Sequence, residues 1–545
     1  MTEPETEPEA APGSKPEPAP ESEPKPETEP AKLGAGSASI AKKAVSGAFW
    51  SVATGVGSRV ISLASTLIVT RYVDPKAYGE VSVAYVVTQL ASLAASLGVG
   101  QYVSTKPNAS RKELFHAAAV FHVAGIAALA LVYLFRTPLG PIFGADHIER
   151  YIAGYLIATF FERIALIPES MLIRDMRFRA GGLIGTVAEL VYSVLVLYLA
   201  VRGYGGMAIV YGGVARCFLR AALGLWVTDR REWSTFHKLD REIVRGVLRF
   251  GLPITGARLS SIIARRGDNL AFSTLFGPAR MGAYNLAYNL ADVPATTVGE
   301  RLGDVLVPSF AKLPENERPG ALLRSLPLVG FAVFPLAALL GGISRPLTLL
   351  LNDTWQALDV RWMLLVLATL SISRPIEWAL RVYLQVAAKT RTIMLIEWAK
   401  AGAIMAAIFS VGRLGPVAAC AAVAGTFMAS VLVYMAVIAR IARVSFASFV
   451  RALAKPFVCA TAMLGGLFLI DRFALSPMAL ATHPSDTGVG FLDRYVLTHW
   501  GAATGITLGL LVGVALYVVI TYLVARDELR RMVQILRRSR SKKPS

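Results

Sequence analysis

Cysteine and histidine are scarce in this chain, which has three cysteines and six histidines among 545 residues. Cys217, Cys420 and Cys459 each lie inside an apolar segment, and none has the short spacing of a redox or metal motif. The histidines are scattered and show no paired ligand spacing. These absences exclude a disulfide framework and a cysteine–histidine metal centre, so we expect no metal and no cofactor.

Charged residues are also few for a chain of this length. They make up 17% of the sequence, whereas 54% is hydrophobic and the mean hydropathy is +0.52. A soluble chain would be far less apolar and would divide into domains of about 100–200 residues. Instead, apolar segments of about 20 residues, enough to span a bilayer as a helix, recur from Ala44 to Ala525. The predicted fold class is an all-α polytopic membrane protein.

Large apolar residues are almost absent from residues 1–40, which are rich in proline and carry nine glutamates against three lysines. Such a segment cannot bury enough apolar surface to offset the entropy of ordering, so we predict a disordered acidic cytoplasmic tail. It also lacks the basic and apolar regions of a signal peptide. Its net charge of −6 leaves +25 for the remaining residues.

This positive charge is concentrated in alternate loops between the predicted spans. Loops after even-numbered spans, with the two flanks, hold about three times as many Lys and Arg residues as loops after odd-numbered spans. The positive-inside rule then places both termini in the cytoplasm and explains the basic charge without a nucleic-acid partner. We predict about fourteen spans, near residues 45–71, 79–103, 114–135, 151–173, 181–201, 205–228, 247–276, 281–311, 321–344, 361–388, 392–412, 415–440, 452–471 and 500–525.

An internal repeat relates the first two spans to spans seven and eight. At an offset of 203 residues, Pro75 matches Pro278 and Gly79 matches Gly282. In each hairpin the proline suits the start of a helix and the glycine relieves crowding, although two unrelated hairpins remain an alternative. Because six helices separate the copies, both enter the membrane in the same sense, as in transporters with parallel repeats. The predicted organisation is two pseudo-symmetric six-helix bundles plus a C-terminal helix pair, divided into a tail (1–40), a first bundle (41–228), a basic cytoplasmic linker (229–246), a second bundle (247–440), helices thirteen and fourteen (441–525) and a basic cytoplasmic tail (526–545).

The first hairpin also carries a recognisable sequence motif. Phe49-Trp50 lies in span one, and the turn that follows contains Arg71, Pro75, Tyr78 and Gly79. This pattern resembles polysaccharide exporters of the PST (Wzx-type) family in the MOP superfamily, whose tryptophan-containing first span precedes an R-x-L-x-P-x-x-Y/F-G turn. The usual leucine is replaced by valine in this chain.

The resemblance implies a flippase rather than an enzyme. Its substrate would be an undecaprenyl-diphosphate-linked oligosaccharide repeat unit, moved across the bacterial inner membrane by alternating access. The pathway would be the biosynthesis of exopolysaccharide, O-antigen or capsule. The implied partners are the lipid-linked oligosaccharide, membrane lipids, a polysaccharide polymerase and a chain-length regulator.

Span seven carries charges at a depth where hydrocarbon is expected. Residues 251–276 include Arg258, Arg265, Arg266 and Asp268. Each charge costs about 2.5–3.5 kcal/mol at mid-membrane, more than the few large apolar residues of this segment offset. At 3.6 residues per turn the arginines share one side of the helix, which must face water, protein or an anionic ligand. We therefore expect this side to line a cavity.

The remaining candidate residues follow from depth and residue type. Arg59 and Arg374 fall about 17–21 Å from the inner surface, close to the depth of Arg258. Guanidinium groups bind phosphate bidentately and keep their charge, so we assign the diphosphate to the arginines of spans one and seven. That set is Arg59, Arg258, Arg265 and Arg266. The set expected to contact sugar or to line the cavity is Gln89, Asn285, Asn289, Arg374 and Arg381.

Three carboxylates are candidates for ion pairing or for coupling transport to a cation: Asp268, Asp292 and Glu377. Asp292 is expected to pair with the span-seven arginines or to bind the coupling cation. Glu377 is expected to pair with Arg381 at the favourable i,i+4 spacing. The residues leave a structural ion pair and a functional carboxylate equally open.

Two other functions are compatible with a polytopic chain. A cation-coupled drug antiporter of the MATE branch requires an acidic cavity, whereas arginines outnumber carboxylates in the spans that carry the candidate residues. A membrane glycosyltransferase or ligase requires a large extramembrane domain or a catalytic outer loop. The longest predicted outer loop, 472–499, contains acidic residues and histidines without a recognisable site.

Overall fold

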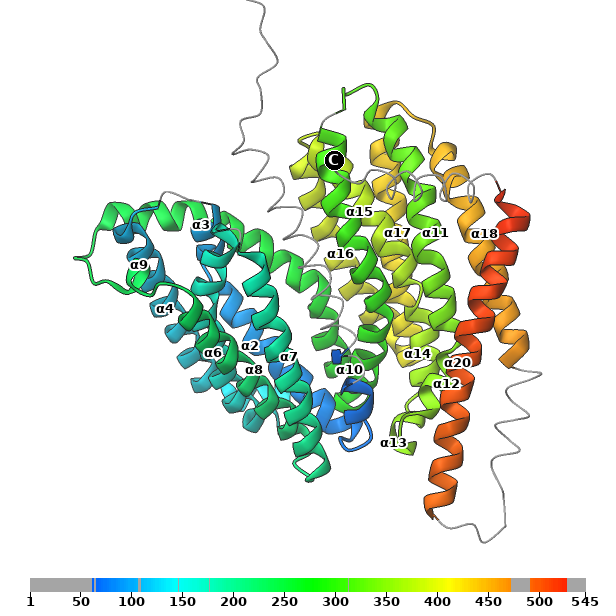
Figure 1. Ribbon diagram of the computed structural model, residues 1–545, viewed down its shortest axis with the longest axis horizontal. Helices are drawn as coiled ribbons and strands as arrows, with labels where there is room; N and C mark the ends of the chain where they lie inside the picture. The colour runs from blue at the N-terminus through cyan, green and yellow to red at the C-terminus, as the bar shows by residue number, and fades with distance from the viewer. Residues whose placement is uncertain are drawn as a thin grey trace, which may run out of the picture. The chain divides into compact units, whose positions relative to one another are not determined.

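The computed structural model describes residues 61–62, 65–105, 109–145, 147–175, 177–311, 313–471 and 491–526; within these it does not describe the side chains of 257, 260–261, 264–265, 297–305, 307–309, 311 and 491–503. The described residues all belong to one compact unit, residues 47–545. Every regular element in them is a helix (Figure 1). Nine of the described helices are long and apolar enough to cross a membrane. The all-α polytopic fold class is therefore confirmed.

The helices of the first half are α2 (Pro75–Ala94), α3 (Val99–Thr105), α4 (Arg111–Leu134), α5 (Arg136–Ile142), α6 (Ile148–Arg174), α7 (Phe178–Val201), α8 (Gly206–Val227) and α9 (Arg231–Ser234). α6 and α7 both pack against α8 (Figure 1). The core shared by α2, α6 and α8 contains Ala84, Ile152 and Val210, all with no exposed side-chain area. These helices form the walls of the cavity described below.

The helices of the second half are α10 (Arg241–Ala311), α11 (Arg318–Gly342), α12 (Ser344–Leu349), α13 (Asp353–Gln356), α14 (Val360–Leu367), α15 (Leu370–Val386), α16 (Thr390–Val411), the 3-10 turn η1 (Gly412–Leu414), α17 (Pro416–Ala442), α18 (Phe446–Ile470) and α20 (Phe491–Val524). α18 packs against both α11 and α20 (Figure 1). α10 contacts α2 of the first half and α15 and α16 of the second, so it joins the two halves.

The observed helices follow most of the predicted spans. Spans seven and eight form α10, which is interrupted only by a non-helical residue, Gly277, with φ 76°. Span ten is divided into α14 and α15. α10 is not among the nine apolar helices, in keeping with its charged side chains. Span one lies mostly outside the described residues, so the count of fourteen stays a prediction.

The turn chemistry predicted from the repeat is confirmed in the first hairpin. Asp74 is the N-cap of α2, and its side chain accepts hydrogen bonds from the backbone N–H groups of Lys76 and Ala77. Pro75 occupies the first turn, where its missing N–H costs nothing. In the second hairpin Gly277 takes the left-handed conformation directly before Pro278, a conformation that glycine adopts without strain.

A buried arginine stabilises the point where α2 ends. Arg163 of α6 is 3% exposed, and its guanidinium donates to the carbonyl oxygens of Ser92 at 3.0 Å, Ala95 at 3.1 Å and Phe121. Two of these carbonyls belong to the end of α2, where no further helical N–H is available to them. This contact gives a membrane-embedded arginine a structural role, because it satisfies backbone acceptors rather than a ligand.

Four charged side chains form a closed ring between α15 and α16. Arg381 and Lys400 each contact both Glu377 and Glu397, with nitrogen–oxygen distances of 2.7–3.0 Å. Ser430 of α17 donates a further hydrogen bond to Glu377 at 3.0 Å. The predicted pair of Glu377 with Arg381 is thus confirmed as one side of a neutral ring. We refer to these four residues as the charge ring.

Removal of one cation from the charge ring should destabilise the fold. Lys400→Met leaves two buried carboxylates with Arg381 alone, and an uncompensated buried charge costs about 3–5 kcal/mol. We expect the free energy of unfolding, measured by SDS titration in detergent micelles, to fall by about that amount. The double variant Glu397→Gln/Lys400→Met keeps a neutral pair and should recover most of the loss.

The matched control is Lys389→Met, because Lys389 is exposed at the start of α16. Its free energy of unfolding should change by no more than about 0.5 kcal/mol. Equal effects of Lys400→Met and Lys389→Met would contradict a stabilising role for the ring.

Candidate substrate cavity

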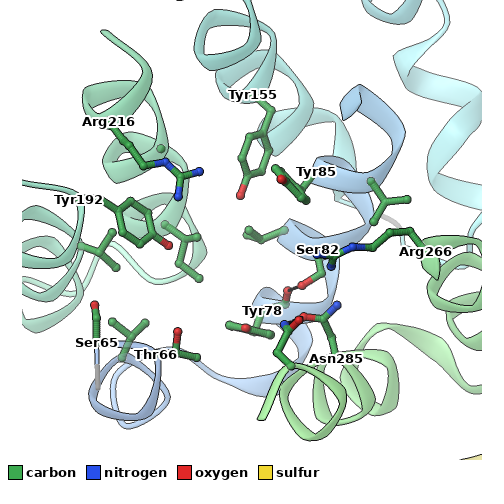
Figure 2. A pocket seen from close by; sticks show the side chains of 17 residues that line it. Ser65, Thr66, Tyr78, Ser82, Tyr85, Tyr155, Tyr192, Arg216, Arg266 and Asn285 are labelled. Carbon is green, nitrogen blue, oxygen red and sulfur yellow. Dashed lines mark hydrogen bonds between the residues drawn. The ribbon is translucent and has the colours of Figure 1, made fainter. Parts of the chain in front are cut away.

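A cavity of about 200 Å³ lies among the helices of the first half and is bordered by α10 (Figure 2). Its lining combines aromatic rings, hydroxyl groups, amides and two guanidinium groups, with aliphatic residues between them. The polar and aromatic lining residues are Ser65, Thr66, Tyr78, Ser82, Tyr85, Tyr155, Tyr192, Arg216, Arg266, Asn285 and Asn289. No carboxylate belongs to this described lining.

Helical periodicity explains how α2 forms one wall. Tyr78, Ser82 and Tyr85 are spaced at i, i+4 and i+7, so they lie on one face of the helix. Tyr155 of α6 and Tyr192 of α7 complete the aromatic walls, and the rings of Tyr85 and Tyr155 are 5.6 Å apart. Figure 2 shows the hydroxyl groups of Tyr155 and Tyr192 directed toward the space between them. The wall therefore presents apolar ring surface together with hydrogen-bonding groups.

Arg216 of α8 extends into this cavity (Figure 2). Its Nη1 lies 3.4 Å from Glu189, and its guanidinium carbon lies 4.8 Å from the centre of the Tyr192 ring. Its Nε is buried and makes no hydrogen bond to the described residues. Arg216 therefore brings a guanidinium to the cavity wall that is paired with one carboxylate.

Arg266 reaches the cavity from α10 and is half-buried. It forms no ion pair or hydrogen bond with the described residues, and no carboxylate lies within ion-pair distance there. A half-buried guanidinium without a partner is energetically costly unless water or an anion meets it. Of the arginines predicted to bind diphosphate, Arg266 has the surroundings that suit this role best.

Of the other predicted diphosphate residues, only Arg258 has a described side chain, and it does not line the cavity. Arg258 is exposed, and the side-chain oxygen of Gln101, with the amide oriented accordingly, accepts from its Nη1 and Nε at 3.0 Å. Arg59 lies outside the described residues, and the side chain of Arg265 is not described. The prediction that four arginines share one site is therefore untested for two of them.

Two of the residues predicted to contact sugar line the cavity, and three do not. Asn285 and Asn289 form part of the lining, and the Asn289 amide donates to Asn285 Oδ1 at 2.7 Å. Gln89 donates to Glu162 at 2.9 Å, and Arg381 belongs to the charge ring. Arg374, also outside the cavity, is 5% exposed and paired with Asp292.

The three predicted carboxylates have different surroundings. Asp292 pairs with Arg374 of α15 rather than with an arginine of span seven, because Asp292 faces α15 while the asparagines one and two turns earlier face the cavity. Glu377 is part of the charge ring. Asp268 is 1% exposed and accepts hydrogen bonds from Tyr284 at 2.5 Å and from the backbone N–H of Asn269 at 2.8 Å. Within the described residues it has no ion-pair partner.

The aromatic lining and Arg216 were not among the residues predicted from the sequence. The i, i+4, i+7 spacing of Tyr78, Ser82 and Tyr85 was a signal for one polar face on α2. Tyr155 and Tyr192 lie in separate helices with no shared spacing, so only packing brings them together. Among the described residues no group of three or more His, Cys, Asp and Glu side chains is suited to hold a metal ion.

Comparison with known proteins identifies the family. Residues 68–358, more than half of the chain, match the family described as "Polysaccharide biosynthesis protein". The chain belongs to this family. The resemblance found in the turn at residues 71–79 is therefore confirmed.

Two curated relatives cover 91% and 62% of the chain. The succinoglycan biosynthesis transport protein ExoT of Rhizobium meliloti (strain 1021) is 23% identical over 512 residues, which is 91% of this chain and 95% of ExoT. The lipopolysaccharide biosynthesis protein WzxC of Escherichia coli (strain K12) is 24% identical over 350 residues, or 62% of this chain and 70% of WzxC. The family member is accordingly an integral membrane protein whose relatives take part in polysaccharide biosynthesis and transport.

Solved structures define the fold of this family member. The lipid II flippase MurJ, in an inward closed conformation, matches with a TM-score of 0.66 at 13% identity, covering 87% of this chain and 98% of MurJ. A multidrug resistance transporter of the MATE family and MOP superfamily, in an inward-facing conformation, matches with a TM-score of 0.58 at 15% identity, covering 76% and 96%. At these identities the likeness shows the fold alone, which this chain shares with both solved structures.

The structure distinguishes tyrosines that stabilise the fold from those that face the cavity. Tyr284→Phe removes a hydrogen bond from the buried carboxylate of Asp268, so we expect a loss of about 1–3 kcal/mol in the free energy of unfolding. Tyr155→Phe is the matched control, because its hydroxyl faces the cavity without a hydrogen bond to the described residues. We expect a change below about 0.5 kcal/mol for this variant in the same SDS titration. Equal losses for the two variants would contradict the assignment.

Proposed function

We propose that the protein translocates undecaprenyl-diphosphate-linked oligosaccharide repeat units across the bacterial inner membrane for surface polysaccharide biosynthesis. The observation that carries this proposal is Arg266, a half-buried guanidinium without a partner among the described residues, at a cavity that also contains Arg216. A cavity with two guanidinium groups and no carboxylate in its lining favours an anion. A diphosphate presents the bidentate acceptor that guanidinium binds most strongly.

The rest of the cavity suits the sugar portion of such a substrate. Tyrosine rings offer apolar faces, and their hydroxyl groups can exchange hydrogen bonds with sugar hydroxyls. Asn285 and Asn289 add amide donors and acceptors at the α10 side of the cavity. Arg59, Arg258 and Arg265 remain in the proposal as further diphosphate ligands in another conformation of the transporter. The prenyl tail would stay in the lipid between the bundles.

In this proposal the bundles 41–228 and 247–440 rock around the cavity in alternating access. Residues 441–525 supply additional helices, and the linker 229–246 and both termini lie in the cytoplasm. Asp268 is the carboxylate best suited to coupling, since Asp292 and Glu377 are already neutralised by cationic partners. No bond in the substrate changes, so we classify the protein as a transporter rather than an enzyme. A polysaccharide polymerase and a chain-length regulator would act on the translocated product.

The MATE-like antiporter remains the alternative from a different substrate class. Its cationic substrates require carboxylates in the binding cavity, whereas the described lining contains guanidinium groups and no carboxylate. The shared fold does not decide between the two, since fold and substrate are separate properties.

The experiment that tests the proposal is gene deletion followed by complementation. We expect the deletion strain to accumulate lipid-linked repeat units on the inner leaflet, measured by mass spectrometry of lipid extracts and by their protection from an impermeant oxidant in spheroplasts. Arg266→Gln should lower complementation by about tenfold or more, because it removes a charge-assisted hydrogen bond to phosphate.

The matched control is Arg280→Gln, an exposed arginine of the same helix beyond the break at Gly277. It should complement as well as the unmodified chain. Unchanged polymer in the deletion strain together with altered resistance to cationic dyes would contradict the proposal and support antiport.

A further inference from the structure

The two turns related by the sequence repeat meet directly in the structure. A Cβ added to Gly79 would collide with the carbonyl oxygen of Pro278, and a Cβ added to Gly282 would collide with the carbonyl oxygen of Pro75. The contact is reciprocal, because each glycine lies against the proline that begins the other copy. Such self-complementary packing is what a two-fold relation between equivalent segments produces. Glycine at both positions lets the two backbones approach this closely.

Three hydrogen bonds between the two halves stabilise the same turn. Trp355 of α13 has no exposed area, and its indole Nε1–H donates to the carbonyl oxygen of Val73 at 3.1 Å. Arg71 Nε donates to the carbonyl oxygen of Leu350 at 3.3 Å, and the Asn352 amide donates to the carbonyl oxygen of Arg71 at 3.4 Å. The three hydrogen bonds join residues 279–282 positions apart in the sequence, and the two glycine contacts join the equivalent turns of the repeat. We refer to them together as the outer seal.

One residue belongs to both the outer seal and the cavity. The ring of Tyr78 lies edge-on to Trp355 with 5.4 Å between the ring centres. Tyr78 also lines the cavity (Figure 2). A ligand that displaces the Tyr78 ring therefore disturbs the packing of Trp355 as well. Tyr78 thus contacts both the cavity and the junction of the two halves.

We infer that the outer seal holds the two halves together on the outer side of the membrane, and that outward opening requires its rupture. The side follows from the sparse Lys and Arg content of the loops after odd-numbered spans, to which residues 71–75 and 345–361 belong. The inference rests on the alternating access of the proposed function. Tyr78 links the occupancy of the cavity to the seal through its contact with Trp355.

The test measures access from the outside without any substrate. The full chain, with its three cysteines replaced by alanine, receives a single reporter, Ser82→Cys, in the cavity. Spheroplasts are then labelled with a membrane-impermeant maleimide. We expect Gly79→Ala and Gly282→Ala each to raise the labelling rate by about tenfold, because an added methyl group forces the crossing backbones apart. Trp355→Phe keeps a ring but loses the hydrogen bond to Val73, so its rate should rise by about threefold.

The matched control is Gly425→Ala in α17, where an added Cβ has nothing within 4 Å. Its labelling rate should equal that of the unmodified reporter chain. If the alanine variants and Trp355→Phe all label at the control rate, the inference is wrong; if they accelerate labelling only from the inner side, its placement on the outer side is wrong. Should an alanine variant fail to accumulate in the membrane, Trp355→Phe decides the outcome. The inference and the proposed function can fail separately. If the seal variants label faster but the gene-deletion strain still synthesises polymer normally, the inference about the outer seal stands and the proposed substrate is wrong.

Discussion

The high cost of an unpaired charge in an apolar interior constrains every part of this structure. An isolated ionised group is tolerated there only with a partner of opposite charge, a set of hydrogen bonds or contact with water. The charge ring between α15 and α16 satisfies this condition with two cations and two carboxylates. Arg163 satisfies it with backbone carbonyl groups at the end of α2. The charge ring and Arg163 are thus accounted for by structure alone.

The exceptions are informative because they are few. Arg216 pairs with Glu189 at 3.4 Å and has a buried Nε without a hydrogen bond, and Arg266 has no partner among the described residues. Both point to the same cavity in the first half. The tyrosines around them supply a surface that is apolar in its faces and polar at its hydroxyl groups. A basic, hydroxyl-rich cavity in a member of the polysaccharide biosynthesis protein family is the physical basis of the proposed flippase activity.

A second constraint acts on the backbone where the two halves meet. Gly79 and Gly282 each occupy a position that no side chain fits, and the two positions correspond in the internal repeat. The predicted role of these glycines was to relieve crowding in a hairpin, and the crowding proves to come from the other copy of the hairpin. Trp355 adds a buried hydrogen bond to the same junction. Tyr78 then brings the junction into contact with the cavity. Binding space and the contact between halves are therefore not independent features.

Residue composition and periodicity were sufficient to predict the membrane class and most helices. The repeat was predicted from matching residues in two hairpins, and the family from the resemblance of the first hairpin to known exporters. Composition and periodicity also singled out Arg266, Asn285 and Asn289, since charged and amide groups in a membrane helix must face something other than lipid. They placed both Arg266 and Arg374 at the cavity, because both are arginines at predicted membrane depth, but only Arg266 lines it. Arg374 is neutralised by Asp292, a residue 82 positions away in sequence, and no local pattern specifies that pairing.

The sequence by itself was enough to establish that the chain crosses a membrane many times, and to predict that its halves are related and that basic side chains lie within it. These properties depend on composition and on spacings of a few residues, which a linear chain records directly. Only the tertiary structure decided which charges are cancelled, which tyrosines surround a cavity and which glycines touch. Those outcomes depend on contacts between helices that are far apart in the sequence. Such contacts are determined by the complementarity of whole helix surfaces, which no short stretch of sequence records.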